Sequence, residues 1–256
     1  MKLTEKEKEA RKMLCLPLDG LDSLPAIQDR IRELSPVVCL FKVGKETFTR
    51  FGPKVIRAVQ DYGDEANVFL DLKYHDIPNT VKLASKAAAE LGVYMFNVHA
   101  SGGLDMMKAA MEGAVDGAQK FNYATPKVVG VTILTSIDDN ILNNELKIPG
   151  TVKERVLDLA QLTYQAGLDG IVCAASDLSY IKSKMPKDRP FIYVTPGIQG
   201  VNTKAGSDQK RVYSPGEAVK DGSSILVVGR AITGQKTSEE RIQAGYEILQ
   251  DMAKYL

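Results

Sequence analysis

The chain has 256 residues, 44% of them hydrophobic and 25% charged, which is an ordinary composition for a soluble globular protein. Its formal net charge of +1 provides no overall positive field, so we expect neither nucleic acid nor a membrane as a partner. The charged N-terminus lacks an apolar signal core, and no apolar run approaches the ~20 residues of a membrane span. These features together predict a cytoplasmic protein.

Short apolar segments alternate with longer amphipathic segments along the whole chain. The predicted strands are 13–18, 37–43, 67–72, 93–98, 127–134, 170–174, 191–195 and 225–229. The spacing of apolar and charged residues predicts helices that include 46–61, 80–91, 103–118 and 152–166. This alternation predicts an α/β fold with a parallel sheet, and eight units predict a single (β/α)8 TIM barrel domain over residues 1–256. A doubly wound open sheet is the competing architecture.

Three cysteines lie far apart in apolar runs, at Cys15, Cys39 and Cys173. Their odd number and their apolar neighbours favour buried thiols. Because the sequence has no C-x-x-C motif or Cys/His cluster, we expect no zinc site.

Polar residues end several of the predicted strands, which is where TIM barrels place their chemistry. Asp19 ends the apolar run of the first strand, Lys42 follows V-V-C-L-F in the second, Asp71 and Lys73 come in the third, and His99 ends the fourth. Strand alternation predicts that Asp71 and Lys73 share one face. For an isolated D-x-K pair, a structural salt bridge is the simpler interpretation, because buried charges are costly unless they are paired.

The third strand continues as a longer polar motif, D-L-K-Y-H-D-I-P-N-T, from Asp71 to Thr80. Asp76 adds a second carboxylate, and Asn79 is a candidate N-cap for the next helix. With Lys42, the motif supplies two lysines and two aspartates that can alternate in sign, so that each group has opposite neighbours and stays ionised. A protein that only binds a ligand has no use for so costly an array, which favours an enzyme.

This motif resembles the signature of the orotidine 5'-phosphate decarboxylase family, D-x-K-x-x-D-I-P-x-T. Further family markers follow in the family's order: L-D-G at 18–20, F-K-V-G at 41–44, N-V-H-A at 97–100, V-T-I-L-T-S at 131–136, T-P-G-I at 195–198, D-Q-K-R-V at 208–212 and V-V-G-R at 227–230. The resemblance extends from about residue 13 to residue 234 and so covers nearly the whole chain.

The resemblance implies decarboxylation of orotidine 5'-phosphate to UMP and CO2, the last step of UMP biosynthesis, without a metal or cofactor. Lys73 would protonate C6 of the pyrimidine, and Asp71 would lie beside the substrate carboxylate. The resemblance also implies a homodimer with shared active sites, in which Asp76, Ile77 and Thr80 reach the partner's site. Lys42 and Asp76 would complete the Lys42–Asp71–Lys73–Asp76 array.

A phosphate site is expected after the seventh and eighth strands, where TIM barrels commonly bind phosphate. The polar, glycine-containing segment 197–213 follows the seventh strand, and Gly229 and Arg230 end the eighth. By resemblance, Gln209 closes over the phosphate that Gly229 and Arg230 hold. Many bacterial members have arginine where this chain has Gln199, which can donate a hydrogen bond but carries no charge, so we expect an altered affinity.

The remaining substrate contacts also come from the resemblance. Asp19 would bind the ribose hydroxyls, Thr135 would face the pyrimidine, and Pro196 would place backbone against the base. His99 is more simply explained as a hydrogen-bonded packing residue.

Two alternatives remain open on sequence grounds. A metal-dependent sugar-phosphate decarboxylase or aldolase of the same superfamily shares the D-x-K-x-x-D strand, but its magnesium ligand on the second strand is a glutamate where this chain has Lys42. A non-catalytic phosphate-binding barrel would need Arg230 but not the charged array. A Rossmann dehydrogenase is disfavoured because no G-x-G-x-x-G follows the first strand.

Overall fold

The computed structural model describes residues 2–63, 65–201 and 213–256. It contains the strands β1 (Leu14–Pro17), β2 (Leu40–Gly44), β3 (Asn67–Tyr74), β4 (Met95–His99), β5 (Lys127–Val131), β6 (Gly170–Val172), β7 (Ile192–Pro196) and β8 (Ile225–Val227). The strands form one closed barrel in the order β1 to β8, and every described register is parallel. The predicted TIM barrel is therefore confirmed, and the open-sheet alternative is wrong.

Helices follow the strands in the alternation that the sequence predicts. They are α1 (Glu5–Met13), α2 (Leu24–Leu34), α3 (Lys45–Phe51), α4 (Lys54–Tyr62), α5 (Pro78–Glu90), α6 (Leu104–Phe121), α7 (Val152–Gln165), α8 (Leu178–Lys184), α9 (Pro215–Lys220), α10 (Arg230–Thr233) and α11 (Ser238–Ala253). The helix predicted at 46–61 is two helices, because Gly52 has a left-handed φ of 58° and Pro53 follows it.

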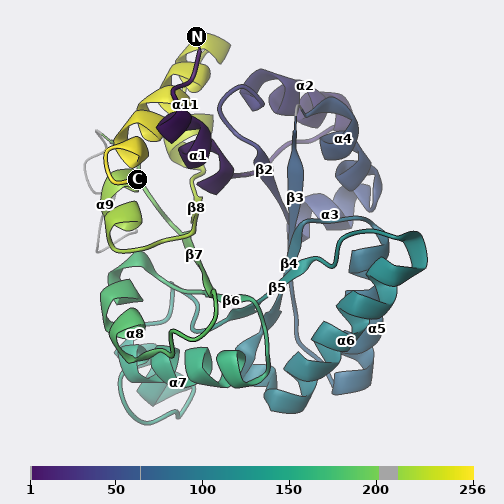
Figure 1. The fold of residues 1–256 in the computed structure, drawn as a ribbon, viewed down its shortest axis with the longest axis vertical. Helices are drawn as coiled ribbons and strands as arrows, with labels where there is room; N and C mark the ends of the chain where they lie inside the picture. Colours follow the sequence, from purple (N-terminus) through teal and green to yellow (C-terminus); the bar gives the residue numbers. More distant parts are fainter. Residues whose placement is uncertain (1, 64, 202–212) are drawn as a thin grey trace. The chain divides into compact units, whose positions relative to one another are not determined.

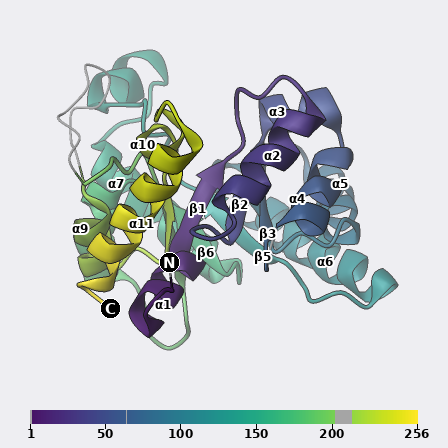
Figure 2. The same cartoon turned by 90° about the horizontal axis from the view of Figure 1, so that it is seen from above.

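The chain divides into two compact units, one of them continuous in sequence. The first unit comprises Met1–Asp71 and Thr195–Leu256, and the second comprises Leu72–Val194. In the first unit, α1 packs beside α11, so the two ends of the chain lie together (Figures 1 and 2). A hydrogen bond of 2.6 Å from Lys6 Nζ to the Leu256 carbonyl joins the two ends.

The second unit is stabilised by close packing of α5 on α6. A Cβ at Gly113 or Gly117 would lie 2.1 Å from the Lys82 carbonyl oxygen or 2.3 Å from that of Lys86, so only glycine fits at these two positions. Helix α5, which begins within the polar motif at Pro78, is thereby packed firmly on α6.

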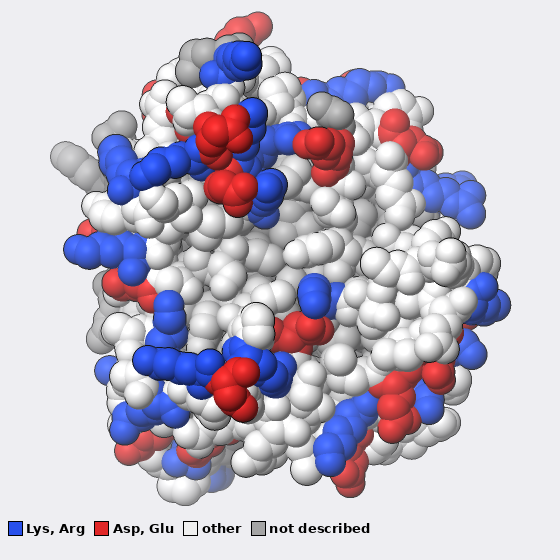
Figure 3. Space-filling view, viewed as in Figure 1, with Lys and Arg blue, Asp and Glu red and all other residues white. Residues whose placement is uncertain are grey.

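The surface carries charges of both signs. On the face drawn in Figure 3, lysine and arginine side chains are interspersed with aspartate and glutamate rather than gathered into an area of one sign. None of the helices in the described ranges has the length and apolar character to span a membrane.

Candidate active site

In the first unit, Lys42 lies between two carboxylates. Its Nζ is 3.1 Å from Asp71 Oδ2 and 3.2 Å from Asp19 Oδ2. The side chains of Lys42 and Asp71 are only 12% and 11% exposed, whereas that of Asp19 is 51% exposed. The parallel register brings these groups together, since it aligns Lys42 with Pro17 and Gly44 with Asp71.

The charge on Lys42 follows from this arrangement. Burial acts to lower the pKa of the ammonium, but the carboxylates of Asp71 and Asp19 outweigh burial and raise the pKa above the ordinary lysine value. A raised lysine pKa contributes stability that is present below the unfolded value and is lost only as the pH rises through the folded value. Lys42 is therefore a fixed cation at neutral pH.

Gly44 makes room for the Lys42–Asp19 pair. A Cβ at this position would lie 2.5 Å from Asp19 Oδ1 and 3.1 Å from Lys42 Nζ. Nearby, the buried Thr47 hydroxyl donates to the Leu18 carbonyl at 3.1 Å and fixes the segment that precedes Asp19. The glycine of F-K-V-G is thus a site residue that the sequence analysis did not single out.

In the second unit, Lys73 ends the regular part of β3 in an unusual conformation. Its φ is +51°, in the left-handed region, which costs a residue with a side chain about 1–2 kcal/mol. Its backbone N–H donates to Oδ1 of the buried Asn97 at 2.8 Å. The alternation that predicts a common face for Asp71 and Lys73 assumes an extended backbone, and Lys73 departs from it.

The segment after Lys73 is exposed. Every residue from His75 to Thr80 is exposed, and the apolar side chain of Ile77 reaches 66%. Asp76 Oδ1 accepts the Ile77 N–H at 2.7 Å. Helix α5 then begins at Pro78 with Ile77 as its N-cap residue, so the prediction that Asn79 caps this helix is wrong. Pro78 has no N–H to be satisfied, which suits it to the first helical position.

Two further predicted residues lie in the second unit. The His99 ring is 5.3 Å from the His75 ring between centroids, with the planes tilted by 42°. This is consistent with the packing interpretation of His99. Thr135 lies exposed in the turn after β5.

Of the residues predicted to bind phosphate, Gly229 and Arg230 lie directly after β8 in the first unit. Gly229 is the N-cap residue of α10, and a Cβ there would lie 3.1 Å from Pro17 Cγ. Arg230 is the first residue of α10, is exposed, and forms no ion pair within the described ranges.

The predicted residues at the end of β7 lie in the same unit. Pro196 ends β7 and is partly exposed, and the Gln199 N–H donates to the Tyr213 carbonyl at 3.3 Å. Gln209 lies outside the described residues.

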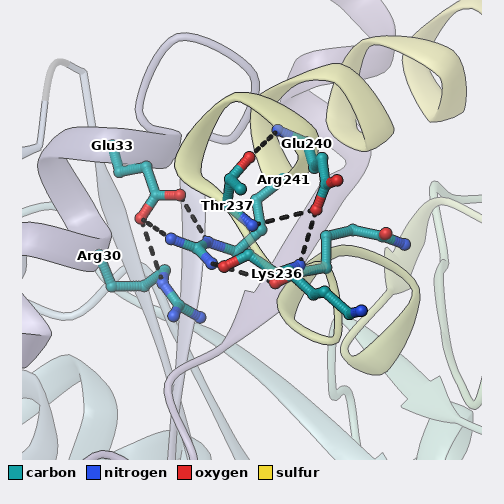
Figure 4. Close-up of polar contacts among 7 residues, drawn as sticks. Arg30, Glu33, Lys236, Thr237, Glu240 and Arg241 are labelled. Atoms are coloured by element: carbon teal, nitrogen blue, oxygen red, sulfur yellow. Dashed lines mark hydrogen bonds and ion pairs between the residues drawn. The ribbon is translucent and has the colours of Figure 1, made fainter.

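Arg241 of α11 anchors the turn that follows α10 (Figure 4). It donates to both carboxylate oxygens of Glu33, at 2.6 and 3.3 Å, and to the carbonyls of Gln235 and Lys236, at 3.0 and 3.2 Å. Both side chains are mostly buried, at 16% and 13% exposure. Burial lowers the pKa of the neighbouring Arg30, and the positive charge of Arg241 lowers it further. The Arg241 fork, meaning its guanidinium with Glu33 and the two carbonyls, fixes the turn after α10, the short helix that begins with Arg230.

Eight parallel strands in a closed order, with ion-paired charges near the strand ends and an exposed arginine after the eighth strand, define a TIM-barrel enzyme. A model of the family described as "Orotidine 5'-phosphate decarboxylase / HUMPS family" matches residues 12–244. The chain belongs to the orotidine 5'-phosphate decarboxylase family and is a carboxy-lyase.

Individual relatives agree with the family model. The chain is 43% identical over 256 residues to an orotidine 5'-phosphate decarboxylase of Syntrophus aciditrophicus, covering 100% of this chain and 99% of the relative. It is 45% identical over 225 residues to one of Pseudoalteromonas translucida, covering 88% and 92%. The crystal structure of orotidine 5'-phosphate decarboxylase from Lactobacillus acidophilus matches with a TM-score of 0.80 and 35% identity, covering 94% and 99%.

Proposed function

We propose that this protein decarboxylates orotidine 5'-phosphate to UMP and CO2 without a metal or cofactor, with Lys73 as the proton donor. The family membership establishes the reaction class and its place in pyrimidine biosynthesis. The observation that carries the mechanistic proposal is Lys42, which is ion-paired with Asp71 of the motif strand and with Asp19. A cation at this position would repel Mg²⁺, which disfavours the metal-dependent sugar-phosphate chemistry.

The reaction leaves an electron pair at C6 of the pyrimidine when the bond to the carboxylate breaks. No electron sink such as a Schiff base is required if a fixed ammonium stabilises this charge where it develops. Lys73 would supply that ammonium and donate its proton to C6, so that UMP and CO2 are the products. Asp76, supplied by the partner chain, would complete the Lys42–Asp71–Lys73–Asp76 array around the substrate.

Asp71 would lie beside the substrate carboxylate. Its 3.1 Å ion pair with Lys42 holds the aspartate in place, and its mostly buried side chain stands in a region of low dielectric. The substrate carboxylate would bind near a like charge, and this repulsion would end as CO2 departs.

The phosphate, the ribose and the base of the nucleotide would be bound by other residues. The exposed guanidinium of Arg230, with Gly229, Gln199 and Gln209, would bind the phosphate, since planar guanidinium groups suit phosphate oxygens. Asp19 accepts from Lys42 through Oδ2 and is half exposed, which would suit it to bind ribose hydroxyls. Thr135 and Pro196 would face the base.

The active form would be a homodimer with shared sites. Support comes from α5 and the segment before it, where Ile77 and Leu83 are 66% and 59% exposed. Large apolar side chains in an exposed segment favour burial against another chain. Asp76, Ile77 and Thr80 would then contribute to the partner's site, and each dimer would hold two sites of mixed origin. The two units of one chain would act as a single catalytic domain.

Mixing two inactive variants tests the shared site. Lys73→Ala and Asp76→Ala should each be inactive, yet a refolded one-to-one mixture should regain about a quarter of the wild-type activity, since half of the dimers carry one intact site. Mixing Lys73→Ala with Asp71→Ala, two changes expected within one chain's contribution, is the matched control and should regain nothing. A mixture of Lys73→Ala and Asp76→Ala without activity would count against sharing.

The primary experiment measures loss of the orotate chromophore from orotidine 5'-phosphate with EDTA present and no added metal. Rapid loss with wild type and none with Lys73→Ala is the expected result. Absence of turnover by the folded wild-type dimer would overturn the proposal. Activity that appears only with Mg²⁺ and a sugar phosphate would establish the other branch of the superfamily.

A further inference from the structure

Lys73 is exceptional among the residues with a left-handed backbone. Four described residues other than glycine have a positive φ, namely Glu65, Lys73, Asn122 and Lys147. Of these, only Lys73 lies within a strand. An unfavourable conformation at this position persists only if neighbouring groups hold it, because an extended backbone is otherwise preferred in a strand.

The side chain of Asn97, on the next strand β4, holds Lys73 in this conformation. Asn97 is 1% exposed, and its Oδ1 accepts the Lys73 N–H at 2.8 Å. The identity of the acceptor is unambiguous, since a backbone N–H can only donate and the amide oxygen is the acceptor of the Asn side chain. A buried amide on a regular strand is a rigid support for the turn at Lys73.

A second contact lies two residues further along the chain from Lys73 and from Asn97. The His75 ring rests on the His99 ring at 5.3 Å, and His99 stands on the same side of β4 as Asn97. Gly102 follows closely, where a Cβ would lie 3.2 Å from His75 Cδ2. The end of β4 therefore supports the motif at two alternate positions, one polar and one aromatic.

We propose that Asn97 is a positioning residue, which holds Lys73 in its left-handed conformation and thereby directs the ammonium group. The inference rests on the proposed role of Lys73 as proton donor. Asn97 acts through the backbone of Lys73 and not on the substrate, so its loss should lower kcat and leave KM nearly unchanged. A misplacement of about 1 Å at a reacting group can cost roughly a hundredfold in rate.

The test compares three variants with the wild-type dimer. Asn97→Leu removes the acceptor while keeping the side-chain size, and Asn97→Asp keeps an acceptor oxygen. Val98→Ala is the matched control, because Val98 is fully buried on the opposite side of the same strand. If Asn97→Leu does not fold, Asn97→Ser replaces it, since the shorter hydroxyl cannot reach the Lys73 N–H in the same geometry.

We expect Asn97→Leu to lower kcat about a hundredfold with KM changed less than about threefold, and Asn97→Asp to recover most of the loss. Val98→Ala should keep kcat within about threefold of wild type. In a sample labelled with 15N-lysine, the Lys73 amide signal, assigned with Lys73→Ala, should exchange slowly with deuterium in wild type and quickly in Asn97→Leu.

Two results would overturn the proposal. One is a wild-type kcat for folded Asn97→Leu or Asn97→Ser, and the other is an equal loss of kcat in Val98→Ala, which would show a general effect of packing. Failure of the proposed function looks different, because wild type itself would then not turn over orotidine 5'-phosphate. The amide exchange remains informative in that case, as it does not depend on activity.

Discussion

Two aspartates of one ten-residue motif occupy contrasting environments. Asp71 is 8% exposed and is held by the Lys42 ammonium at 3.1 Å. Asp76, five residues later, is exposed, and its carboxylate accepts the N–H of the next residue at 2.7 Å. The same functional group is thus a fixed internal charge at one position and an available charge at the other. The contrast teaches that burial and pairing, rather than residue type, decide what a carboxylate in this motif can do.

The largest expected effect is on the free energy of unfolding, which should fall much more when Asp71 is replaced than when Asp76 is replaced. Asp71→Ala would leave the Lys42 ammonium buried beside only the half-exposed Asp19, and we expect the free energy of unfolding to fall by about 3–5 kcal/mol. Asp76→Ala removes only a local hydrogen bond and should cost about 1 kcal/mol or less. Both should lower turnover strongly. Urea denaturation of the two variants checks the prediction, and equal losses of stability would contradict the contrast.

Two arginines in and near the predicted phosphate site show a similar contrast between a buried and an exposed charge. Arg241→Ala removes a mostly buried fork that bonds Glu33 and two carbonyls, and should cost about 2–4 kcal/mol of stability. Arg230→Ala, at an exposed position, should leave stability within about 0.5 kcal/mol but raise KM about tenfold to a hundredfold. Thermal unfolding and steady-state kinetics on the same samples separate the two roles. A stable Arg241→Ala with an unchanged KM would show that the fork does not fix α10.

A smaller effect is expected at Gly44, where the Lys42–Asp19 ion pair needs space. Gly44→Ala would bring a methyl group to 2.5 Å from Asp19 Oδ1, so the Asp19 carboxylate must move away from Lys42. Overpacking of this kind costs about 1–3 kcal/mol, and we expect kcat/KM to fall about tenfold. Gly44 has a φ of −83°, which alanine adopts freely, so a loss would come from the close contact and not from backbone strain. A wild-type kcat/KM in Gly44→Ala would show that Asp19 needs no fixed place.

The smallest effect concerns the residue after Lys73 and is visible only in alkali. Burial raises the pKa of Tyr74 from 10.0 to about 12. Because the folded pKa is raised, stability is fully present below the unfolded value near 10 and is lost as the pH rises toward 12. Tyr74→Phe, which keeps the ring against Phe96, should unfold with a weaker dependence on pH between these values. Chemical denaturation at pH 7 and in this alkaline range makes the comparison. If the free energy of unfolding depends on pH equally in both proteins, the Tyr74 hydroxyl is hydrated in the folded state.

The barrel could be predicted from the sequence because its signal repeats eight times. Each strand was found from a short apolar run, but some predicted bounds are too long, as at 127–134, where the strand ends at Val131. Apolar residues continue into the turn there, and an apolar run does not show where ladder hydrogen bonds stop. The helix at 46–61 was predicted as one segment, since its periodicity continues across Gly52 and Pro53.

Within the site, sequence placed Asp19, Lys42 and Asp71 at strand ends, and the structure brings these three together. The roles of the individual site residues stay predictions. The left-handed Lys73 and its partner Asn97 could not be predicted, because neither a lysine nor a strand asparagine signals a positive φ. Arg241 and Glu33 are 208 positions apart, and local patterns carry no information at that distance.

The division of the chain into a continuous and a discontinuous unit has a consequence for biosynthesis. Residues 72–194 are synthesised as one block, whereas β1 and β2 emerge from the ribosome long before β8, the strand that pairs with β1. Until then, the β1 edge and the surface of α1 that α11 later covers are open to wrong partners. A nascent chain therefore spends most of its synthesis with one edge of β1 unpaired until β8 is made, and with the surface of α1 uncovered until α11 is made.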